Sequence, residues 1–194
     1  MSTAEMQVAS RRAFLAGGVA VLGAATLITV SHRALAASGG NWVTIENFSA
    51  SGDSLGTVRV QKLVRPEVQW KALLSPESFD VTRRAGTEPA FTGAYWNNHA
   101  DGLYRCICCD TALFDSRAKF ESGTGWPSFY QPISKRNVAE TADRSLFMER
   151  TAISCTRCDA HLGHVFDDGP KPTDLRYCMN SAALKFLPRG KQQA

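Results

Sequence analysis

The sequence predicts a mainly β domain that begins with two short helices, and three observations support this fold class. After residue 90 the chain falls into short, partly alternating runs separated by Gly, Pro and Asp, with no long helical periodicity. Residues 65–89 instead carry helix start signals. Two cysteine pairs, far apart in the sequence, indicate a metal ion that ties two parts of a sheet together. We therefore expect antiparallel sheets with helices at their start.

The expected elements follow in chain order. "WVTIENF" (42–48) and "GTVRVQKLV" (56–64) alternate in part and could form a small hairpin ahead of the main domain. Pro66 can open a first helix, and Ser75 followed by Pro76 gives the N-cap and first position of a second. Later strands are expected in "GLYRC" (102–106), "KFES" (119–122), "PSFYQPI" (127–133), "SLFMERTAISC" (145–155), "HLGHVF" (161–166) and "LRYCMNSAALKFL" (175–187).

The N-terminus has the features of a twin-arginine export signal. Arg11 and Arg12 precede a stretch rich in Gly and Ala at 13–30, and a small-x-small cleavage site ends at Ala36. The alternative is a retained membrane anchor, for which these 18 residues are barely long enough. We expect an exported, periplasmic protein that uses the twin-arginine export machinery, and membrane tethering if the signal is not cleaved.

The domain organisation follows from this interpretation. Residues 1–36 form the signal, residues 37–64 a linker and N-terminal extension with the possible hairpin, and residues 65–194 the main domain. The chain has 22 basic and 18 acidic residues; the signal holds three and one of these, so the net charge falls from +4 to +2 without it. This balance, without a run of Lys and Arg among aromatic residues, argues against nucleic-acid binding.

Four of the six cysteines form two CxxC motifs, Cys106 with Cys109 and Cys155 with Cys158. Each motif is followed by Asp-x-x-Leu, an internal echo that two similar turns facing one ion would explain. A shell of four thiolates favours one structural Zn²⁺ ion, with iron as the other candidate. Two disulfides or a redox-active CxxC are the alternatives. Cys108 could replace Cys109 as a ligand, but the echo favours Cys109.

Two cysteines remain, Cys108 and Cys178, and Cys178 is the candidate nucleophile. If "LRYCMN" is a strand, Arg176, Cys178 and Asn180 point to one face. A nearby cation lowers the pKa of a thiol, and the thiolate is the nucleophilic form. The alternative is a cysteine buried as a small apolar residue, but an apolar core would not place Arg and Asn on the same face.

Two histidines and a tryptophan are further candidates. His161 and His164 lie on opposite faces of a regular strand, so they serve one site only if Gly163 bends the chain. Together they could donate protons or position a water molecule. Trp126, in the glycine-containing loop "SGTGWPSF", could form an apolar wall for a small substrate group or be a core residue at a turn.

The segments "YRCICCDTALFDSRAKFESGTGWPSFYQPI" and "CTRCDAHLGHVFDDGPKPTDLRYCMNSAALKF" resemble the methionine-R-sulfoxide reductases, the B type of peptide methionine sulfoxide reductase. The resemblance covers residues 65–189, and the motifs GWPSF, HLGHVFxDGP and RYCxNSAAL are specific. It implies a β-tent fold of two antiparallel sheets with N-terminal helices and a four-cysteine zinc site. The implied activity is that of a peptide-methionine (R)-S-oxide reductase, which repairs oxidised methionine, protein-bound or free, as part of the response to oxidative stress.

The resemblance also implies roles for single residues. The Cys178 thiolate would attack the sulfoxide sulfur and become a sulfenic acid as methionine departs. The polar groups around the substrate oxygen and its water would be His161, His164 and Asn180. The basic residue two positions before the nucleophile would be Arg176. The ring against which the substrate methyl packs would be that of Trp126.

The chain departs from the family pattern at one position. Where many members carry a resolving cysteine in the SGxGWPSF loop, this sequence has Thr124. The sulfenic acid would then be resolved by Cys108, through a disulfide with Cys178, or by direct attack of an external thiol. Cys108 could equally be an inert packing residue. A thioredoxin-like reductant is the expected partner.

Two functions of other classes stay open. One is a zinc-stabilised binding module in which Cys178 has no chemical role. The other is a thiol–disulfide oxidoreductase or an iron–thiolate electron carrier, although the chain lacks a CxxC before a helix in a βαβ setting.

Overall fold

The computed structural model describes residues 41–144 and 150–190 of the chain. The predicted export signal therefore lies outside the described residues. Within these two ranges, no helix has the length and apolar character needed to cross a membrane.

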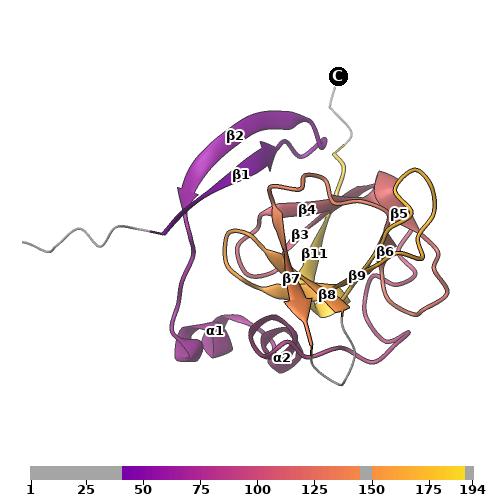
Figure 1. Ribbon diagram of the computed structural model, residues 1–194. Coiled ribbons are helices and arrows are strands. Elements are labelled where there is room, and N and C mark those ends of the chain that lie inside the picture. Colours follow the sequence, from indigo (N-terminus) through magenta and orange to yellow (C-terminus); the bar gives the residue numbers. More distant parts are fainter. Residues whose placement is uncertain (1–40, 145–149, 191–194) are drawn as a thin grey trace, which may run out of the picture. The chain divides into compact units, whose positions relative to one another are not determined.

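The described chain forms short strands, two α-helices and two turns of 3-10 helix (η). In chain order these are β1 (Trp42–Phe48), β2 (Ser54–Gln61), α1 (Glu67–Leu73), α2 (Pro76–Arg84), β3 (Gly102–Cys106), β4 (Ala112–Asp115), η1 (Ser116–Ala118), β5 (Lys119–Phe120), β6 (Ser128–Phe129), β7 (Val138–Asp143), β8 (Arg150–Cys155), β9 (His161–Phe166), β10 (Arg176–Met179), η3 (Ser181–Ala183) and β11 (Leu184–Pro188) (Figure 1).

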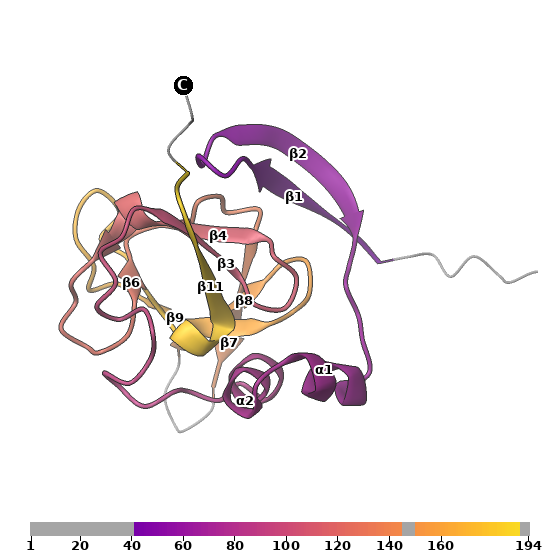
Figure 2. The same ribbon diagram turned by 180° about the vertical axis from the view of Figure 1, so that it is seen from behind.

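Two antiparallel sheets make up the body of the domain. The larger has the strand order β5-β6-β10-β9-β8-β7, and the smaller has the order β11-β3-β4. Figure 2 shows the smaller sheet from behind, with β11 beside β3. The strands β1 and β2 pair only with each other, as a separate hairpin. The predicted mainly β fold with short helices before the sheets is confirmed.

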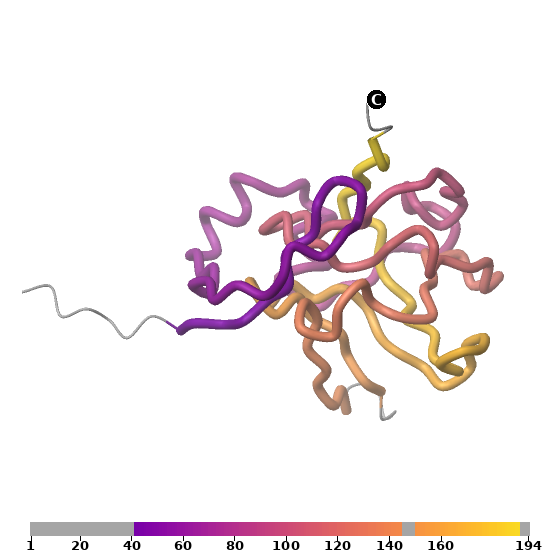
Figure 3. The backbone as a smooth tube through the Cα atoms, turned by 90° about the horizontal axis from the view of Figure 1, so that it is seen from above, coloured from indigo at the N-terminus to yellow at the C-terminus, as the bar shows by residue number. Residues whose placement is uncertain are grey.

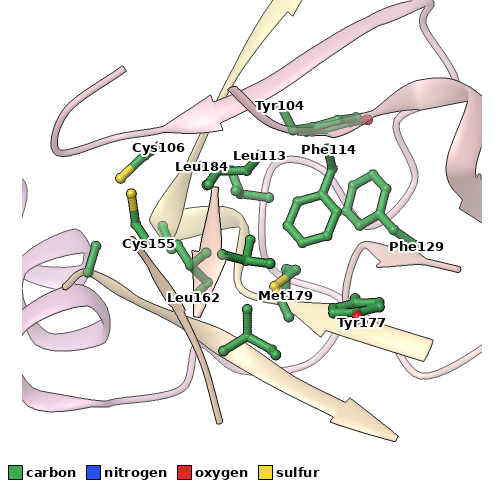
Figure 4. Close-up of a cluster of buried hydrophobic side chains, with 14 of the residues drawn as sticks. Tyr104, Cys106, Leu113, Phe114, Phe129, Cys155, Leu162, Tyr177, Met179 and Leu184 are labelled. Atoms are coloured by element: carbon green, nitrogen blue, oxygen red, sulfur yellow. The ribbon is translucent and has the colours of Figure 1, made fainter. Parts of the chain in front are cut away.

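The core lies between the two sheets (Figure 4). Phe114 of β4 and Phe129 of β6 stack with their ring centroids 4.5 Å apart. Tyr177 and Met179 of β10 are buried in the same cluster. Because side chains alternate along a strand, Cys178 between them points to the opposite face of the larger sheet.

The segment 175–187, predicted as one run, forms two strands in different sheets. β10 ends, η3 follows, and β11 then joins the smaller sheet. The buried carboxylate of Glu88 accepts hydrogen bonds from the amides of Ser181 and Ala182, both at 2.7 Å, and so stabilises the turn. This carboxylate comes from a loop far away in the sequence, and the local pattern of 175–187 therefore does not reveal the break.

Other strand boundaries also differ from the predicted ones. The run 127–133 contributes only the two residues of β6, because Pro127 and Pro132 have no amide hydrogen to donate to a neighbouring strand. The strands β4 and β7 were not among those expected. The strand β4 has only four residues, and β7 carries little alternation of its own.

The helix start signals and the hairpin are confirmed. The Ser75 hydroxyl accepts a hydrogen bond from the amide of Ser78 at 3.0 Å and caps α2. The hairpin is anchored by the buried side chain of Asn137, which accepts from the amide of Glu46 and donates to its carbonyl, both at 2.8 Å. Figure 3 traces the chain from this hairpin through the helices into the sheets.

Candidate functional site

The four predicted metal ligands come together. Cys106 ends β3 and Cys155 ends β8, so each sheet supplies one CxxC turn. The four sulfurs lie within 4.8 Å of one another, with 3.6 Å from Cys106 to Cys158 and 3.5 Å from Cys109 to Cys155. Four ligands on bonds of about 2.3 Å around a tetrahedral ion lie about 3.8 Å apart, so the thiols fit a single metal ion.

The two turns share one backbone geometry, as the sequence echo suggests. Asp110 and Asp159, which follow the second cysteine of each motif, have positive φ angles of 61° and 55°. Each of their amides donates to the carbonyl of the first cysteine at 2.9 Å. The shared Cys-x-x-Cys-Asp pattern therefore encodes a shared turn.

Cys108 lies beside this cluster but in different surroundings from Cys178. Its sulfur is 3.4 Å from the Arg83 guanidinium of α2, which also donates to the Cys158 carbonyl at 2.9 Å. The Cys178 sulfur instead lies 3.9 Å from the Thr124 hydroxyl. In the described part of the chain the two thiols do not touch. A disulfide between them needs Cβ atoms about 3.5–4.5 Å apart, and Cys108 would have to leave its contact with Arg83 to form it.

Cys178 has polar neighbours on both sides along the larger sheet. In the strand register it pairs with His164 of β9 and with Ser128 of β6. Directly paired residues point to the same face of a sheet. Arg176 lies two residues earlier on β10 and shares this face. The structure thus brings Cys178, His164 and Arg176 together.

Burial dominates the electrostatics of Cys178 and raises the pKa of its thiol. The positive charge of Arg176 and the hydroxyls of Thr124 and Ser128 act in the opposite direction without outweighing burial. The predicted effect of Arg176 on the pKa thus has the right sign, but the net shift is upward. The guanidinium is itself paired with Asp168 through two hydrogen bonds of 2.8 Å, which fix its position.

Gly163 brings both histidines to one place. The pairing between β8 and β9 contains a bulge at Leu162 and Gly163. Ile153 pairs with Gly163, but the next residue, Ser154, pairs with His161. Gly163 has a φ of 154°. The rings of His161 and His164 meet edge to face with their centroids 5.3 Å apart. The condition set from the sequence, a bend at Gly163, is therefore met.

The two histidines have different environments. His164 Nε2 lies 2.8 Å from a carboxylate oxygen of Asp143, and Arg150 donates to the same oxygen at 2.8 Å. His161 Nε2 is buried and has no hydrogen-bond partner among the described residues. Burial, reinforced by the charges of His164 and Arg150, lowers the pKa of His161 to about 4. His161 is therefore neutral near pH 7.

Asn180, two residues after Cys178, is buried. Its side chain is 3% exposed, accepts from the amide of Glu88 at 3.0 Å and donates to the carbonyl of Leu162 at 3.1 Å. Its backbone is extended, with φ −80° and ψ 131°, so the alternation of β10 continues to this residue. Asn180 joins the end of β10 to β9 and to the loop that carries Glu88.

Trp126 is half-buried, and its indole Nε1 donates to the Glu88 carbonyl at 3.0 Å. Glu88 therefore positions Trp126 through its carbonyl, Asn180 through its amide and η3 through its carboxylate. Sequence reasoning missed Glu88, Asp143 and Asp168. The last could have been found, because an acidic residue in "FDDGP" is a natural partner for a nearby Arg; the other two carry no local signal.

The fold and site define a class of proteins in which one sheet carries a single cysteine on a polar face and a cluster of four other cysteines joins this sheet to a second one. The SelR domain family matches residues 74–188. The chain belongs to this family, which contains the enzymes called peptide methionine sulfoxide reductase MsrB.

Three relatives illustrate the similarity. A peptide methionine sulfoxide reductase MsrB of Herminiimonas arsenicoxydans is 53% identical over 126 residues, 65% of this chain and 92% of the relative. Peptide methionine sulfoxide reductase B1, chloroplastic, of Arabidopsis thaliana is 61% identical over 121 residues, 62% of this chain and 59% of the relative. The MsrB of Acinetobacter baylyi is 57% identical over 125 residues, 64% of this chain and 90% of the relative.

Proposed function

We propose that this protein is a peptide-methionine (R)-S-oxide reductase, which reduces methionine-R-sulfoxide, protein-bound or free, to methionine. The observation that carries the proposal is the position of Cys178. It is a single thiol on a polar strand face, paired with His164 and Ser128 and beside Arg176, in a chain of the MsrB family.

The reaction would begin with attack of the Cys178 thiolate on the sulfoxide sulfur. The sulfur–oxygen bond of the substrate breaks, and the oxygen ends on the cysteine as a sulfenic acid. The cysteine sulfur loses the two electrons that the substrate sulfur gains, and one proton is taken up. Methionine then departs.

The histidines have complementary roles in this proposal. Asp143 holds the imidazole of His164, which lies beside Cys178 and would deliver the proton to the substrate oxygen. His161 is neutral and would orient a water molecule. Arg176, held in place by Asp168, would stabilise the thiolate through its charge and through a hydrogen bond from its guanidinium. Asn180 would be a positioning residue.

Trp126 would select the epimer. Its ring is anchored by Glu88 and offers an apolar surface to the substrate methyl. With the methyl on this ring and the oxygen toward the histidines, only one arrangement around the chiral sulfur exposes the sulfur to Cys178. The R epimer is the expected one, by analogy with the family.

An external thiol would return the enzyme to its reduced state. Thr124 occupies the position where the sequence pattern of many relatives has a resolving cysteine, so a reductant thiol would attack the sulfenic acid, release water and form a mixed disulfide. A second thiol of a thioredoxin-like partner would then reduce this disulfide. Resolution by Cys108 would need rearrangement at Arg83, and mass mapping after one turnover tests for the linkage.

The four-cysteine cluster would hold one structural Zn²⁺ ion. Four thiolates leave no open coordination position, so the ion would stabilise the fold and take no part in the reaction. Cys106, Cys109, Cys155 and Cys158 would be its ligands.

We also propose that the protein acts after export, on the basis of Arg11, Arg12 and the site ending at Ala36. Twin-arginine export would carry the domain folded and metal-loaded. Replacement of both arginines by lysine, followed by cell fractionation, tests this; unchanged export of the double variant contradicts it.

The function is tested by supplying each epimer of a methionine sulfoxide substrate to the metal-loaded protein with dithiothreitol. We expect turnover of the R epimer alone, and loss of turnover in Cys178→Ser. Thr57→Val, which removes an exposed hydroxyl on β2, is the matched control and should keep full activity. Absence of turnover with both epimers in the folded wild-type protein contradicts the proposal.

A further inference from the structure

Three hydroxyl groups form a chain beside the nucleophile. The Ser122 hydroxyl lies 2.8 Å from that of Thr124 and 2.8 Å from that of Ser128. At one end the Thr124 hydroxyl lies 3.9 Å from the Cys178 sulfur, and at the other the Ser128 hydroxyl donates to the Trp126 carbonyl at 3.2 Å. Four contacts thus lead from the nucleophile to the residue that would hold the substrate methyl.

The hydrogens available for these contacts can be counted. The neutral thiol and the three hydroxyls carry one each, four in all. A carbonyl oxygen only accepts, so Ser128 donates to Trp126. Ser122 must then donate to Ser128, and Thr124 to Ser122. The Cys178 thiol is left as the donor to Thr124, and this is the only assignment that fills every contact.

Ionisation of Cys178 leaves three hydrogens for four contacts. Thr124 then turns its hydrogen to the thiolate, because a hydrogen bond to a charged acceptor is about twice as strong as a neutral one. Its contact with Ser122 survives only if Ser122 and Ser128 reverse as well, and the Trp126 carbonyl then loses its donor. Ionisation therefore removes one hydrogen bond from the chain, whichever contact is given up.

We propose that Ser122, Thr124 and Ser128 form a positioning chain that favours the neutral thiol of Cys178 in the resting protein and stabilises the thiolate when Thr124 reverses. Thr124 and Ser122 then shift the ionisation of Cys178 in opposite directions. Thr124 favours the thiolate, because it can donate a hydrogen bond to it. Ser122 favours the neutral thiol, because it accepts the hydrogen of Thr124 and so keeps it away from the sulfur. The significance of this chain for catalysis rests on the proposed role of Cys178 as nucleophile.

Other groups around Cys178 also influence its ionisation, and the test leaves them unchanged. Ser128 faces it from β6, and its hydroxyl also lowers the pKa of Cys178 directly, so Ser128 is not used in the test. The charged and titratable groups nearby come from four strands and the segment after β9: they are Arg176 on β10, His161 and His164 on β9, Asp143 on β7, Arg150 on β8, and Asp168 just after β9. A shift of the Cys178 pKa in a Ser122 or Thr124 variant therefore reports on the hydroxyl chain alone.

The test is the pH dependence of Cys178 alkylation by iodoacetamide in the metal-loaded full chain, followed on the Cys178 peptide by mass spectrometry. Only the thiolate reacts, so the midpoint of the rate profile gives the pKa of Cys178. We expect Ser122→Ala to lower this midpoint and Thr124→Val to raise it, each by about half a unit to one unit. Below the midpoint this corresponds to an alkylation rate about three- to tenfold higher or lower.

The controls separate the chain from a general disturbance. Thr124→Ser keeps the hydroxyl and should match the wild-type midpoint, as should Thr57→Val. If Thr124→Val fails to fold by circular dichroism, Thr124→Ala takes its place. Shifts of the same sign in the Ser122 and Thr124 variants, or an unchanged midpoint in Ser122→Ala, overturn the proposal. No sulfoxide enters this assay, so its outcome is independent of the proposed reductase activity.

Discussion

Asp143 shows how a single residue without any sequence motif can shape the site. It ends β7 and holds both the imidazole of His164 and the guanidinium of Arg150 on one carboxylate oxygen. A carboxylate that accepts from one ring nitrogen of a histidine fixes the tautomer and the ring orientation. Asp143 is therefore expected to act through His164.

We predict that Asp143→Asn lowers kcat about tenfold to a hundredfold with little change in KM, because His164, the proposed proton donor, is misoriented while the proposed substrate contacts are kept. Asp143→Glu keeps the carboxylate and should recover part of the loss. Steady-state kinetics with the R sulfoxide measure both variants. An equal loss in both, with a raised KM, would indicate a structural role instead.

His161 makes the stability of the protein depend on pH. Its pKa is about 4 in the folded state against 6.5 for the free group, so the unfolded chain binds the proton first as the pH falls. Stability contributed by the neutral ring is present above pH 6.5 and is lost as the pH falls toward 4.

We therefore predict that the free energy of unfolding of the wild type decreases between about pH 7 and about pH 4.5, and that this decrease is smaller in His161→Gln. Urea unfolding at both pH values measures the difference. Parallel profiles for the two proteins would show that another group causes the acid sensitivity.

At the level of elements, the contact between β9 and β10 is the critical one, because it places His164 beside Cys178. Gly163 makes this contact possible. A Cβ atom on Gly163 would overlap with the carbonyl oxygen of Cys178 and meet the Cα of Met179 at 3.0 Å. The overlap is with backbone, which cannot rotate away as a side chain can.

Gly163→Ala should therefore destabilise the protein by about 3 kcal/mol or more and reduce activity further than stability alone explains, since β10, which carries Cys178, is displaced. Gly190→Ala is the matched control, because a Cβ atom there meets open space. Urea unfolding and the sulfoxide assay test both. Gly163→Ala with stability close to that of Gly190→Ala would contradict the expected overlap.

Elements with local signals were predictable from the sequence, and those defined by distant partners were not. Ser75 caps a helix a few residues away, and each CxxC-Asp turn closes on itself, so both could be inferred. The break between β10 and β11 depends on Glu88, and the amide that donates to the Asn180 side chain comes from the same distant residue.

The same distinction applies to the site as a whole. Cys178, Arg176 and the two histidines could be chosen from the sequence because their side chains suit the chemistry. Whether Gly163 bends the chain could not be decided from the sequence. Which residue faces which is set by strand register between β6, β10 and β9, and register is a long-range property. The partners Asp143 and Asp168 depend on the same long-range arrangement.

At the scale of the whole molecule, the four-cysteine cluster links the two sheets that carry the core. Cys106 ends β3 of the smaller sheet, and Cys109 lies in the turn to β4. Cys155 ends β8 of the larger sheet, and Cys158 lies in the turn to β9. The strand β9 also carries both histidines of the site. Loss of the proposed metal ion should therefore loosen the sheets against each other and disturb the site.

We predict one zinc ion per chain, and a fall in Tm of more than about 10 °C on treatment with a strong chelator, with loss of activity, because a structural site contributes folding free energy directly. Cys109→Ser should bind less than one zinc ion per chain, whereas Cys108→Ser should keep full occupancy, since Cys108 contacts Arg83 and lies outside the cluster of four. Metal analysis and calorimetry of both variants decide the ligand set. Loss of zinc in Cys108→Ser with retention in Cys109→Ser would reverse the assignment.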